Sequence, residues 1–190
     1  MTVTITPLAP PEILVIEPKV FTDHRGFFLE THHQIKYTDA GLERIFVQDN
    51  HSRSQQSVLR GLHYQLQKPQ GKLVYAVRGE IFDVAVDIRR GSPTFGQWTG
   101  TCLSDVNHRQ LFIPEGFAHG FVVLSESADV VYKCTQFYEP GDEYGIYWKD
   151  PEIGIDWPVE APILSEKDQL FPTLNSAPEA HLPVYQAGGP

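Results

Sequence analysis

Short runs of apolar and β-branched residues recur along the chain between Ile13 and Tyr138, and Gly, Pro, Asn or Asp separate them. Such runs at short spacing are typical of strands joined by tight turns. The pattern therefore predicts an all-β domain, built as a sandwich or a barrel. The expected strands are 13–16, 27–31, 44–48, 59–66, 72–77, 80–88, 97–103, 110–113, 121–124 and 130–138.

The clearest alternation lies in residues 80–88, where one face of the predicted strand is entirely apolar. The other face carries two carboxylates, Asp83 and Asp87. Either these carboxylates meet solvent, or they point into the interior of a barrel, where buried charges need partners. The sequence leaves both interpretations open.

Helical periodicity is sparse. Residues 34–40 predict a turn or two of helix before Gly41, and residues 165–170 predict a short helix capped by Ser165. Neither segment is long enough to organise the fold.

Length and composition fit one folded domain spanning residues 1–190. Hydrophobic residues make up 41% of the chain, which is enough to form a core and excludes a disordered protein. We expect the core to span about residues 13–168. The proline-rich start and the tail 174–190 should be extended or mobile unless a partner subunit holds them.

The net charge of −9 and the scattered Lys and Arg residues argue against a nucleic-acid polymer as partner. The N-terminus lacks the cationic start and the apolar region of an export signal. No apolar run approaches the length that crosses a bilayer, so we expect no membrane contact. Cys102 and Cys134 lack metal-site spacing. We expect two buried, inert thiols and a cytoplasmic location.

Two histidines occupy comparable places on the predicted scaffold. His63 lies within one strand, and His119 follows another strand about 56 positions later. This spacing is similar to the two half-motifs of the cupin superfamily, whose metal-binding members take two histidines and an acidic residue from the first half. Here Tyr64 and Gln65 follow His63, so too few ligands remain for a divalent ion, and we expect no metal and no cofactor. A metal-dependent cupin oxygenase stays as an alternative.

Without a metal, His63 is a candidate base, because a neutral imidazole accepts a proton near neutral pH. Lys72 shares its strand face with small neighbours and can meet the negative charge that develops on a carbonyl oxygen. Tyr132, which shares a face of the predicted strand 130–138 with Tyr138, is a candidate acid. The three groups together are suited to moving a proton at a carbon next to a carbonyl.

Arg60 lies three residues before His63, so a regular strand would turn these two side chains to opposite faces. Gly61 is a candidate bulge that brings both to one face. Otherwise Arg60 serves a site on the other face or on an adjoining subunit.

A longer series of motifs is more specific than spacing and parity. It includes TDHRGFFLE at 22–30, QDNHS at 48–52, VLRGLHYQ at 58–65, QGKLV at 70–74 and SEKD at 165–168. Over about residues 13–168, these motifs resemble the dTDP-4-dehydrorhamnose 3,5-epimerase family. Cys134 stands where we expect Thr or Asn, and nothing after Asp168 has a match that carries a function.

The resemblance implies a metal-free cupin-type double-stranded β-helix, a jelly roll with a few short helices, that forms a homodimer. It implies epimerisation at both C3 and C5 of the substrate dTDP-4-dehydro-6-deoxy-D-glucose, through an enolate, giving dTDP-4-dehydro-L-rhamnose in dTDP-L-rhamnose synthesis. His63 is then the base, oriented by Asp168. Tyr132 is the acid, and Lys72 stabilises the enolate. The positions implied in substrate binding are Phe21, Arg25, Phe27, Glu30, Gln48, Asn50, Arg60, His119, Tyr138, Glu143 and Lys167.

Two further alternatives stay open. Relatives that epimerise only C5 or only C3 share most of these motifs, so a single-site epimerase of dTDP-4-keto-6-deoxy sugars is the first. The second is a sugar-nucleotide binding module without catalysis, for which the cationic residues that hold a diphosphate suffice.

Overall fold

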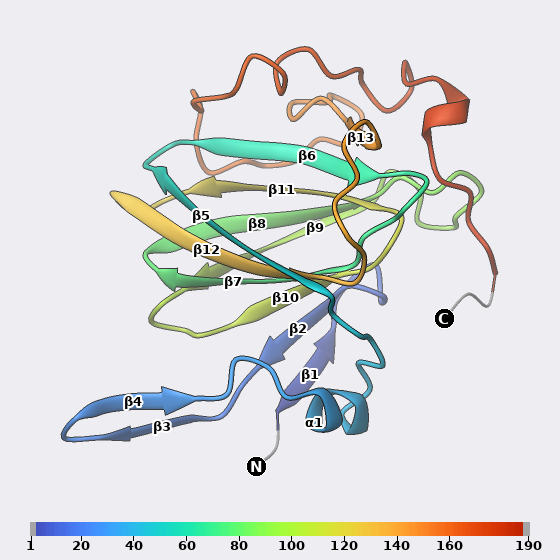
Figure 1. Cartoon of the computed structure of the whole chain (residues 1–190). Helices are drawn as coiled ribbons and strands as arrows, with labels where there is room; N and C mark the ends of the chain where they lie inside the picture. The colour runs from blue at the N-terminus through green and yellow to red at the C-terminus, as the bar shows by residue number, and fades with distance from the viewer. Residues whose placement is uncertain (1–2, 188–190) are drawn as a thin grey trace.

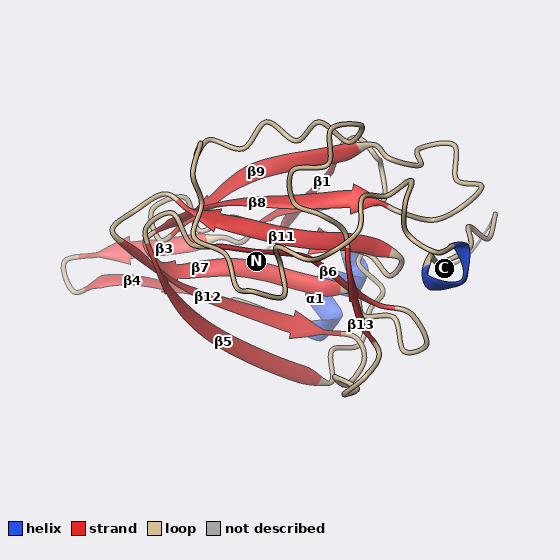
Figure 2. Cartoon of the chain, turned by 90° about the horizontal axis from the view of Figure 1, so that it is seen from above, coloured by secondary structure: helices blue, strands red, loops and turns tan. Residues whose placement is uncertain are grey.

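The computed structural model describes residues 3–187, which fold into two antiparallel β-sheets facing each other (Figure 1, Figure 2). The expected all-β jelly roll is confirmed. The first sheet has the order β1 (Thr4–Pro7), β2 (Leu14–Glu17), β10 (Gln110–Ile113), β7 (Lys72–Arg78), β12 (Ser127–Cys134) and β5 (Gln48–Gln55). The second has the order β13 (Glu143–Gly145), β6 (Leu59–Gln65), β11 (Phe117–Val123), β8 (Glu80–Asp87) and β9 (Trp98–Ser104).

Three smaller elements lie outside these sheets. A hairpin of β3 (Val20–Asp23) and β4 (Gly26–Leu29) extends away from the sheets as an arm (Figure 1). The helix α1 (Gln34–Asp39) confirms the first helical prediction. A 3-10 helix, η1 (Glu179–His181), lies in the C-terminal tail.

The main core lies between the two sheets, because alternate residues of each strand point inward. From β8, for example, Ile81 and Ala85 enter this core, while Val84 and Val86 face the other way. The buried members of the inner cluster are Ile13, Val74, Ile81, Ala85, Leu103, Leu111, Ile113, Phe117, Phe121, Val123, Ala128 and Val130.

The C-terminal tail covers the outer face of the second sheet (Figure 1). Leu174, Ala177 and Leu182 are buried there, in the same cluster as Val84 and Val86 of β8. The tail up to residue 187 thus docks on its own chain. Both faces of β8 are buried as a result.

The two carboxylates of β8 are fully buried, so their interpretation as solvated groups is wrong. Asp83 contacts His119, with the imidazole Nε2 at 3.0 Å from Oδ2. Asp87 accepts hydrogen bonds from Arg89, Ser92 and Thr94. These partners offset the cost of burying two charges.

Several predicted elements differ in their bounds. The run 44–48 is wrong as a strand, because β5 begins only at Gln48 and continues to Gln55. The run 130–138 is partly wrong, since β12 ends at Cys134. Tyr138 therefore lies in the loop after β12 and does not share a strand face with Tyr132.

The second predicted helix, 165–170, is a series of turns. Ser165 still caps it as expected, because its hydroxyl oxygen accepts the backbone N–H of Asp168 at 3.1 Å. The turn thereby fixes the position of Asp168.

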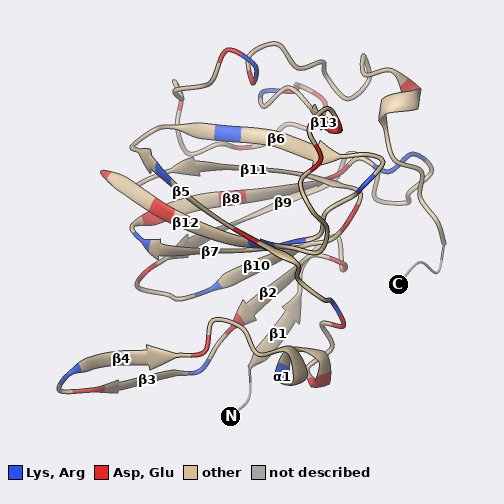
Figure 3. Ribbon diagram, in the orientation of Figure 1, with Lys and Arg blue, Asp and Glu red and all other residues tan. Residues whose placement is uncertain are grey.

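Charged residues are spread over the ribbon with both signs mixed (Figure 3). None of the helices in residues 3–187 is long and apolar enough to span a membrane. Both cysteines are free thiols; Cys134 is buried as expected, whereas Cys102 is exposed and that expectation is wrong.

Candidate active site

A cavity of about 610 Å³ lies between the sheets and contains the three groups expected to move a proton. His63 enters it from β6 of the second sheet. Tyr132 of β12 and Lys72 of β7 enter it from the first sheet. The lining residues are Ser52, Val58, Leu59, Arg60, His63, Lys72, His119, Phe121, Tyr132, Glu143, Ile163, Leu164, Ser165, Lys167 and Asp168.

The imidazole and the phenol therefore belong to opposite walls of one cavity, because the two sheets face each other across it. Lys72 and Tyr132 lie on neighbouring strands, where Tyr132 pairs with Val74 and Cys134 with Lys72. A ligand between the walls meets a base on one side and a phenol on the other.

A bulge in β6 resolves the conflict between Arg60 and His63. In the ladder with β11, His119 pairs with His63 and Phe121 pairs with Arg60, so the two residues between them on β6 oppose the single Gly120 of β11. Gly61 lies in this bulge with φ +130°, and a Cβ there would approach the Gly120 Cα to 2.5 Å. Both Arg60 and His63 consequently line the cavity.

His63 is held by a buried carboxylate. Its Nε2 lies 2.7 Å from Asp168 Oδ1, and the Gly61 N–H points at Oδ2 from 3.5 Å. Burial raises the pKa of Asp168, but the hydrogen bonds from His63 and Gly61 outweigh it, so the net pKa lies below the ordinary value. Asp168 is thus ionised and accepts a hydrogen bond from the Nε2–H of His63, which leaves Nδ1 as the basic nitrogen.

The surroundings of this Nδ1 are also polar. Glu143 Oε1 lies 3.9 Å from it, and the other carboxylate oxygen of Glu143 accepts a hydrogen bond from Lys167 at 2.8 Å. Glu143 and Lys167 are therefore a paired group at the cavity wall, next to the basic nitrogen.

His119 and Asp83 make a second imidazole–carboxylate pair, directly beside the first in the sheet. Burial lowers the pKa of His119, although Asp83 opposes this. The ring is neutral at pH 7, its Nε2–H donates a hydrogen bond to Asp83, and Nδ1 is a hydrogen-bond acceptor. Within residues 3–187, no three His, Cys, Asp or Glu side chains are grouped as a metal-ligand set.

Burial shifts the pKa values of Lys72 and Tyr132 in opposite directions. It lowers the pKa of Lys72, against the attraction of Cys134, Asp83 and Glu143. It raises the pKa of Tyr132, so the phenol keeps its proton at neutral pH and can give it away. No hydrogen bond or ion pair from residues 3–187 reaches the Lys72 ammonium, so its three donors are available to a ligand.

Four of the positions expected to bind substrate lie on the N-terminal arm, away from the cavity. Phe21, Arg25 and Phe27 border a separate hollow of about 330 Å³ on the β3–β4 hairpin. Glu30 pairs with Lys36 of α1. The structure does not bring these four residues to the cavity of their own chain.

Gln48 and Asn50 lie on β5 beside the cavity without lining it. The Gln48 side chain donates to Asn50 Oδ1 at 3.0 Å, and Asn50 in turn contacts the Cys134 sulfur at 3.5 Å. Asn50 pairs with Tyr132 in the ladder. These amides support the wall that carries the phenol.

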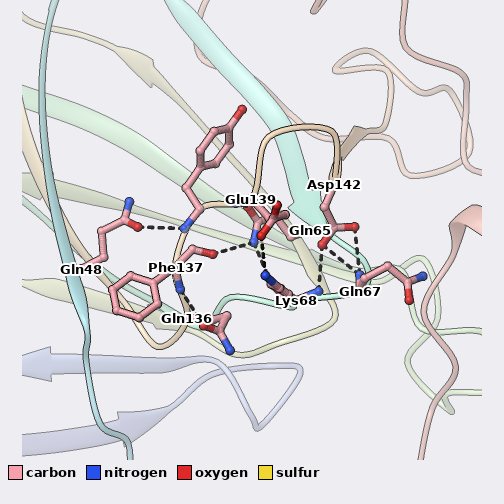
Figure 4. Close-up of polar contacts among 9 residues, drawn as sticks. Gln48, Gln65, Gln67, Lys68, Gln136, Phe137, Glu139 and Asp142 are labelled. Carbon is pink, nitrogen blue, oxygen red and sulfur yellow. Dashed lines mark hydrogen bonds and ion pairs between the residues drawn. The ribbon is translucent and has the colours of Figure 1, made fainter.

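Tyr138 also does not line the cavity, and half of its surface is exposed. Glutamines nevertheless fix both peptide groups that flank it (Figure 4). The Tyr138 N–H donates to Gln48 at 2.8 Å. The Gln65 side chain receives the Glu139 N–H at 2.9 Å and donates to the Phe137 carbonyl at 3.2 Å. The loop that carries Tyr138 is therefore rigidly tied to β5 and β6.

Replacing Gln65 by Met should lower the free energy of unfolding by about 2–3 kcal/mol, because three backbone groups lose their hydrogen bonds to this buried carboxamide. The third is the Lys68 carbonyl, 2.7 Å from Gln65 Nε2. Urea denaturation at constant m-value measures this change. Gln56→Met is the matched control, since that carboxamide makes one exposed bond to the Leu124 carbonyl, and its loss should cost less than about 0.5 kcal/mol. Equal losses of unfolding free energy in both variants would contradict a stabilising role of the Gln65 hydrogen bonds.

The sequence analysis missed several lining residues. Ser52 follows Gln48 and Asn50 at a spacing of two, so the parity of a strand would have placed it on the same face, had this polar run been recognised as one. Phe121 follows His119 by the same rule. Ile163 and Leu164 come from a loop that joins the barrel next to β6, where Leu59 donates to the Ile163 carbonyl at 2.9 Å, and no sequence signal indicates that contact.

Comparisons with known proteins give the relatives of this chain. A sequence model of the dTDP-4-dehydrorhamnose 3,5-epimerase family matches residues 7–176. The dTDP-4-dehydrorhamnose 3,5-epimerase of Pseudomonas aeruginosa is 60% identical over 166 residues, which cover 86% of this chain and 92% of that protein. The dTDP-4-dehydrorhamnose 3-epimerase of Streptomyces niveus is 41% identical over 184 residues, covering 95% and 89%.

A solved structure is equally similar. The dTDP-6-deoxy-D-glucose-3,5-epimerase of Legionella pneumophila, in complex with dTDP-4-keto-L-rhamnose, has a TM-score of 0.94 and 53% identity, and the match covers 97% of this chain and 99% of that one. Fold and sequence are thus similar over nearly the whole length of both chains. The chain belongs to the dTDP-4-dehydrorhamnose 3,5-epimerase family.

Proposed function

We propose that the protein epimerises both C3 and C5 of dTDP-4-dehydro-6-deoxy-D-glucose and yields dTDP-4-dehydro-L-rhamnose. The observation that carries the proposal is the placement of His63 and Tyr132 on opposite walls of one cavity, which Lys72 also lines. Inversion at a carbon requires a proton to leave on one face and return on the other.

The steps follow from the protonation states. Nδ1 of His63 removes the proton from a carbon next to the C4 ketone, and the electron pair moves to the C4 oxygen. Lys72 stabilises this enolate oxygen with an N–H donor. Tyr132 then gives its proton to the carbon from the opposite face, and solvent restores the phenol and the neutral imidazole. C3 and C5 share the C4 oxygen, so one set of groups serves both carbons.

Exchange with deuterated water tests this reaction. Incubation of the substrate in deuterated water should place deuterium at both C3 and C5, which NMR of the product resolves. Label at neither carbon rejects the mechanism and favours the binding module without catalysis. Label at one carbon shows a single-site epimerase, the second candidate. The similarity to the 3-epimerase of Streptomyces niveus is the observation that supports this candidate.

We infer that the reaction needs no metal. His63 and His119 each commit Nε2 to a buried carboxylate, which leaves one nitrogen per imidazole for the ligand in the cavity. Activity should be unchanged after treatment with a strong chelator and dialysis. Loss of activity that Fe²⁺ or Zn²⁺ restores would favour the cupin oxygenase alternative.

We further propose a cytoplasmic homodimer in which the arm of one chain serves the cavity of the other. Arg25 and the exposed Phe27 lie on a hairpin that extends from the sheets, too remote for their own cavity (Figure 1). A partner that covers the exposed aromatic residues is consistent with their apolar surface. Sizing chromatography should give twice the chain mass of 21.5 kDa, and a monomer at working concentration would contradict shared sites.

A further inference from the structure

The residue opposite His63 in the sheet has no side chain. Gly145 of β13 pairs with His63 of β6, and a cross-strand neighbour at that position would normally pack against the imidazole. A Cβ on Gly145 would lie 2.4 Å from Cε2 of Phe171. Phe171 therefore occupies the space of the missing side chain, although it lies 26 residues further along the chain, between Asp168 and the tail.

Phe171 contacts the imidazole in an edge-on arrangement. The two ring centroids are 5.6 Å apart, and the ring planes make an angle of 75°. Edge-to-face pairs at this separation are favourable for aromatic rings. This ring contact is made in addition to the hydrogen bond between Nε2 and Asp168.

The backbone around Phe171 is anchored on the loop that follows β13. The Tyr147 N–H donates to the Pro172 carbonyl at 2.7 Å. The Leu174 N–H donates to the buried Asp150 carboxylate at 2.6 Å, and the Leu174 side chain is itself buried. With Asp168 fixed on one side and Leu174 on the other, the phenyl ring has little freedom to move away from His63.

The second contact matters because one hydrogen bond does not fix a ring plane. The outer torsion of a histidine side chain has a broad energy profile. The bond from Nε2 to Asp168 acts at one end of the ring and leaves rotation about that axis. A phenyl ring packed beside the axis restricts this rotation and thereby sets the direction of the Nδ1 lone pair.

We propose that Phe171 is a positioning residue for His63, and that the chain beyond Asp168 is part of the active site for this reason. The proposal deepens the proposed epimerase function and rests on His63 being its base. Phe171 acts on the orientation of the imidazole and does not itself touch the substrate.

The test compares Phe171→Ala with Phe171→Tyr, which keeps the ring. For Phe171→Ala, kcat should fall about tenfold for exchange at both C3 and C5, since both use His63, while KM stays within twofold. Phe171→Tyr should retain most of the wild-type kcat. In protein labelled with 15N-histidine, the His63 ring signals should broaden or shift in Phe171→Ala without any substrate.

Leu182→Ala is the matched control, because it removes a buried apolar side chain of the same tail from the cluster under the second sheet. It should lower the melting temperature but leave kcat and the His63 signals unchanged. The proposal is overturned if Phe171→Ala leaves both kcat and these signals at wild-type values, or if Leu182→Ala lowers kcat equally. Failure of the wild-type protein to exchange deuterium rejects the proposed function instead, and the 15N signals still decide whether Phe171 holds the ring.

Discussion

Changing His63 to Gln should reduce deuterium exchange at C3 and C5 by about 10³- to 10⁴-fold, because the reaction loses its base. The amide of Gln can still donate to Asp168, so the buried carboxylate keeps a partner and the fold is preserved. Affinity for dTDP, measured by calorimetry, should change less than threefold. Binding without turnover separates the chemical role of His63 from a structural one.

The control is the same change at a histidine outside the cavity. His51 is exposed and its Nε2 lies 2.9 Å from Asp129, so His51→Gln alters an imidazole–carboxylate pair of similar geometry. Exchange should stay within twofold of wild type. If His63→Gln kept more than a tenth of the wild-type exchange rate, another group would have to be the base.

An element or site residue could be predicted where neighbouring residues in the sequence carry the pattern that indicates it. The strand β8 was predicted almost to its ends, because its alternation is written in eight consecutive residues. The strand β5 was missed over most of its length, since Gln48–Gln55 contains no apolar residue. It is an edge strand with one face toward a polar cavity, so the hydrophobic pattern that indicates a strand is absent.

The site residues follow the same division. Motif similarity indicated His63, Lys72, Tyr132 and Asp168, and the fold brings all four to one cavity. The bulge that aligns Arg60 with His63 needs the close approach of two glycines from different strands, which is not a local property.

Contacts across long loops were the least predictable. No sequence signal distinguishes Phe171 from other apolar residues near the C-terminus. Its role depends on the folded chain, in which its ring fills the space next to Gly145. The fate of Asp83 was left open for a similar reason, because its partner His119 lies on the next strand of the sheet and 36 residues away in sequence. Burial of a charge follows from tertiary pairing and not from strand parity alone.

Changing Lys72 to Met should reduce kcat by about 10²- to 10³-fold at both carbons, because both enolates place their charge on the same C4 oxygen and lose the same donor. KM should rise much less. Met keeps the length of the side chain, so the cavity retains its shape. A loss at one carbon only would mean that a different group stabilises the other enolate.

The same substitution should make the fold more stable at neutral pH. Burial holds the pKa of Lys72 below its unfolded value near 10.5, so folding disfavours the charged form and the unfolded state binds more protons. This destabilisation is complete below the lowered pKa, diminishes as the pH rises and vanishes above about 10.5. The gain of Lys72→Met over wild type in urea denaturation should therefore be largest near neutral pH and disappear toward pH 11.

Lys133→Met is the control for both effects. Lys133 lies on β12 next to the position that pairs with Lys72, but its ammonium bonds Asp49 at 2.7 Å outside the cavity. Its replacement should leave kcat unchanged and lower stability slightly, by less than about 1 kcal/mol. The two stability changes have opposite signs because the Lys133 ammonium has a carboxylate partner in the folded protein. The Lys72 ammonium is buried, and its role is to bind the substrate oxygen.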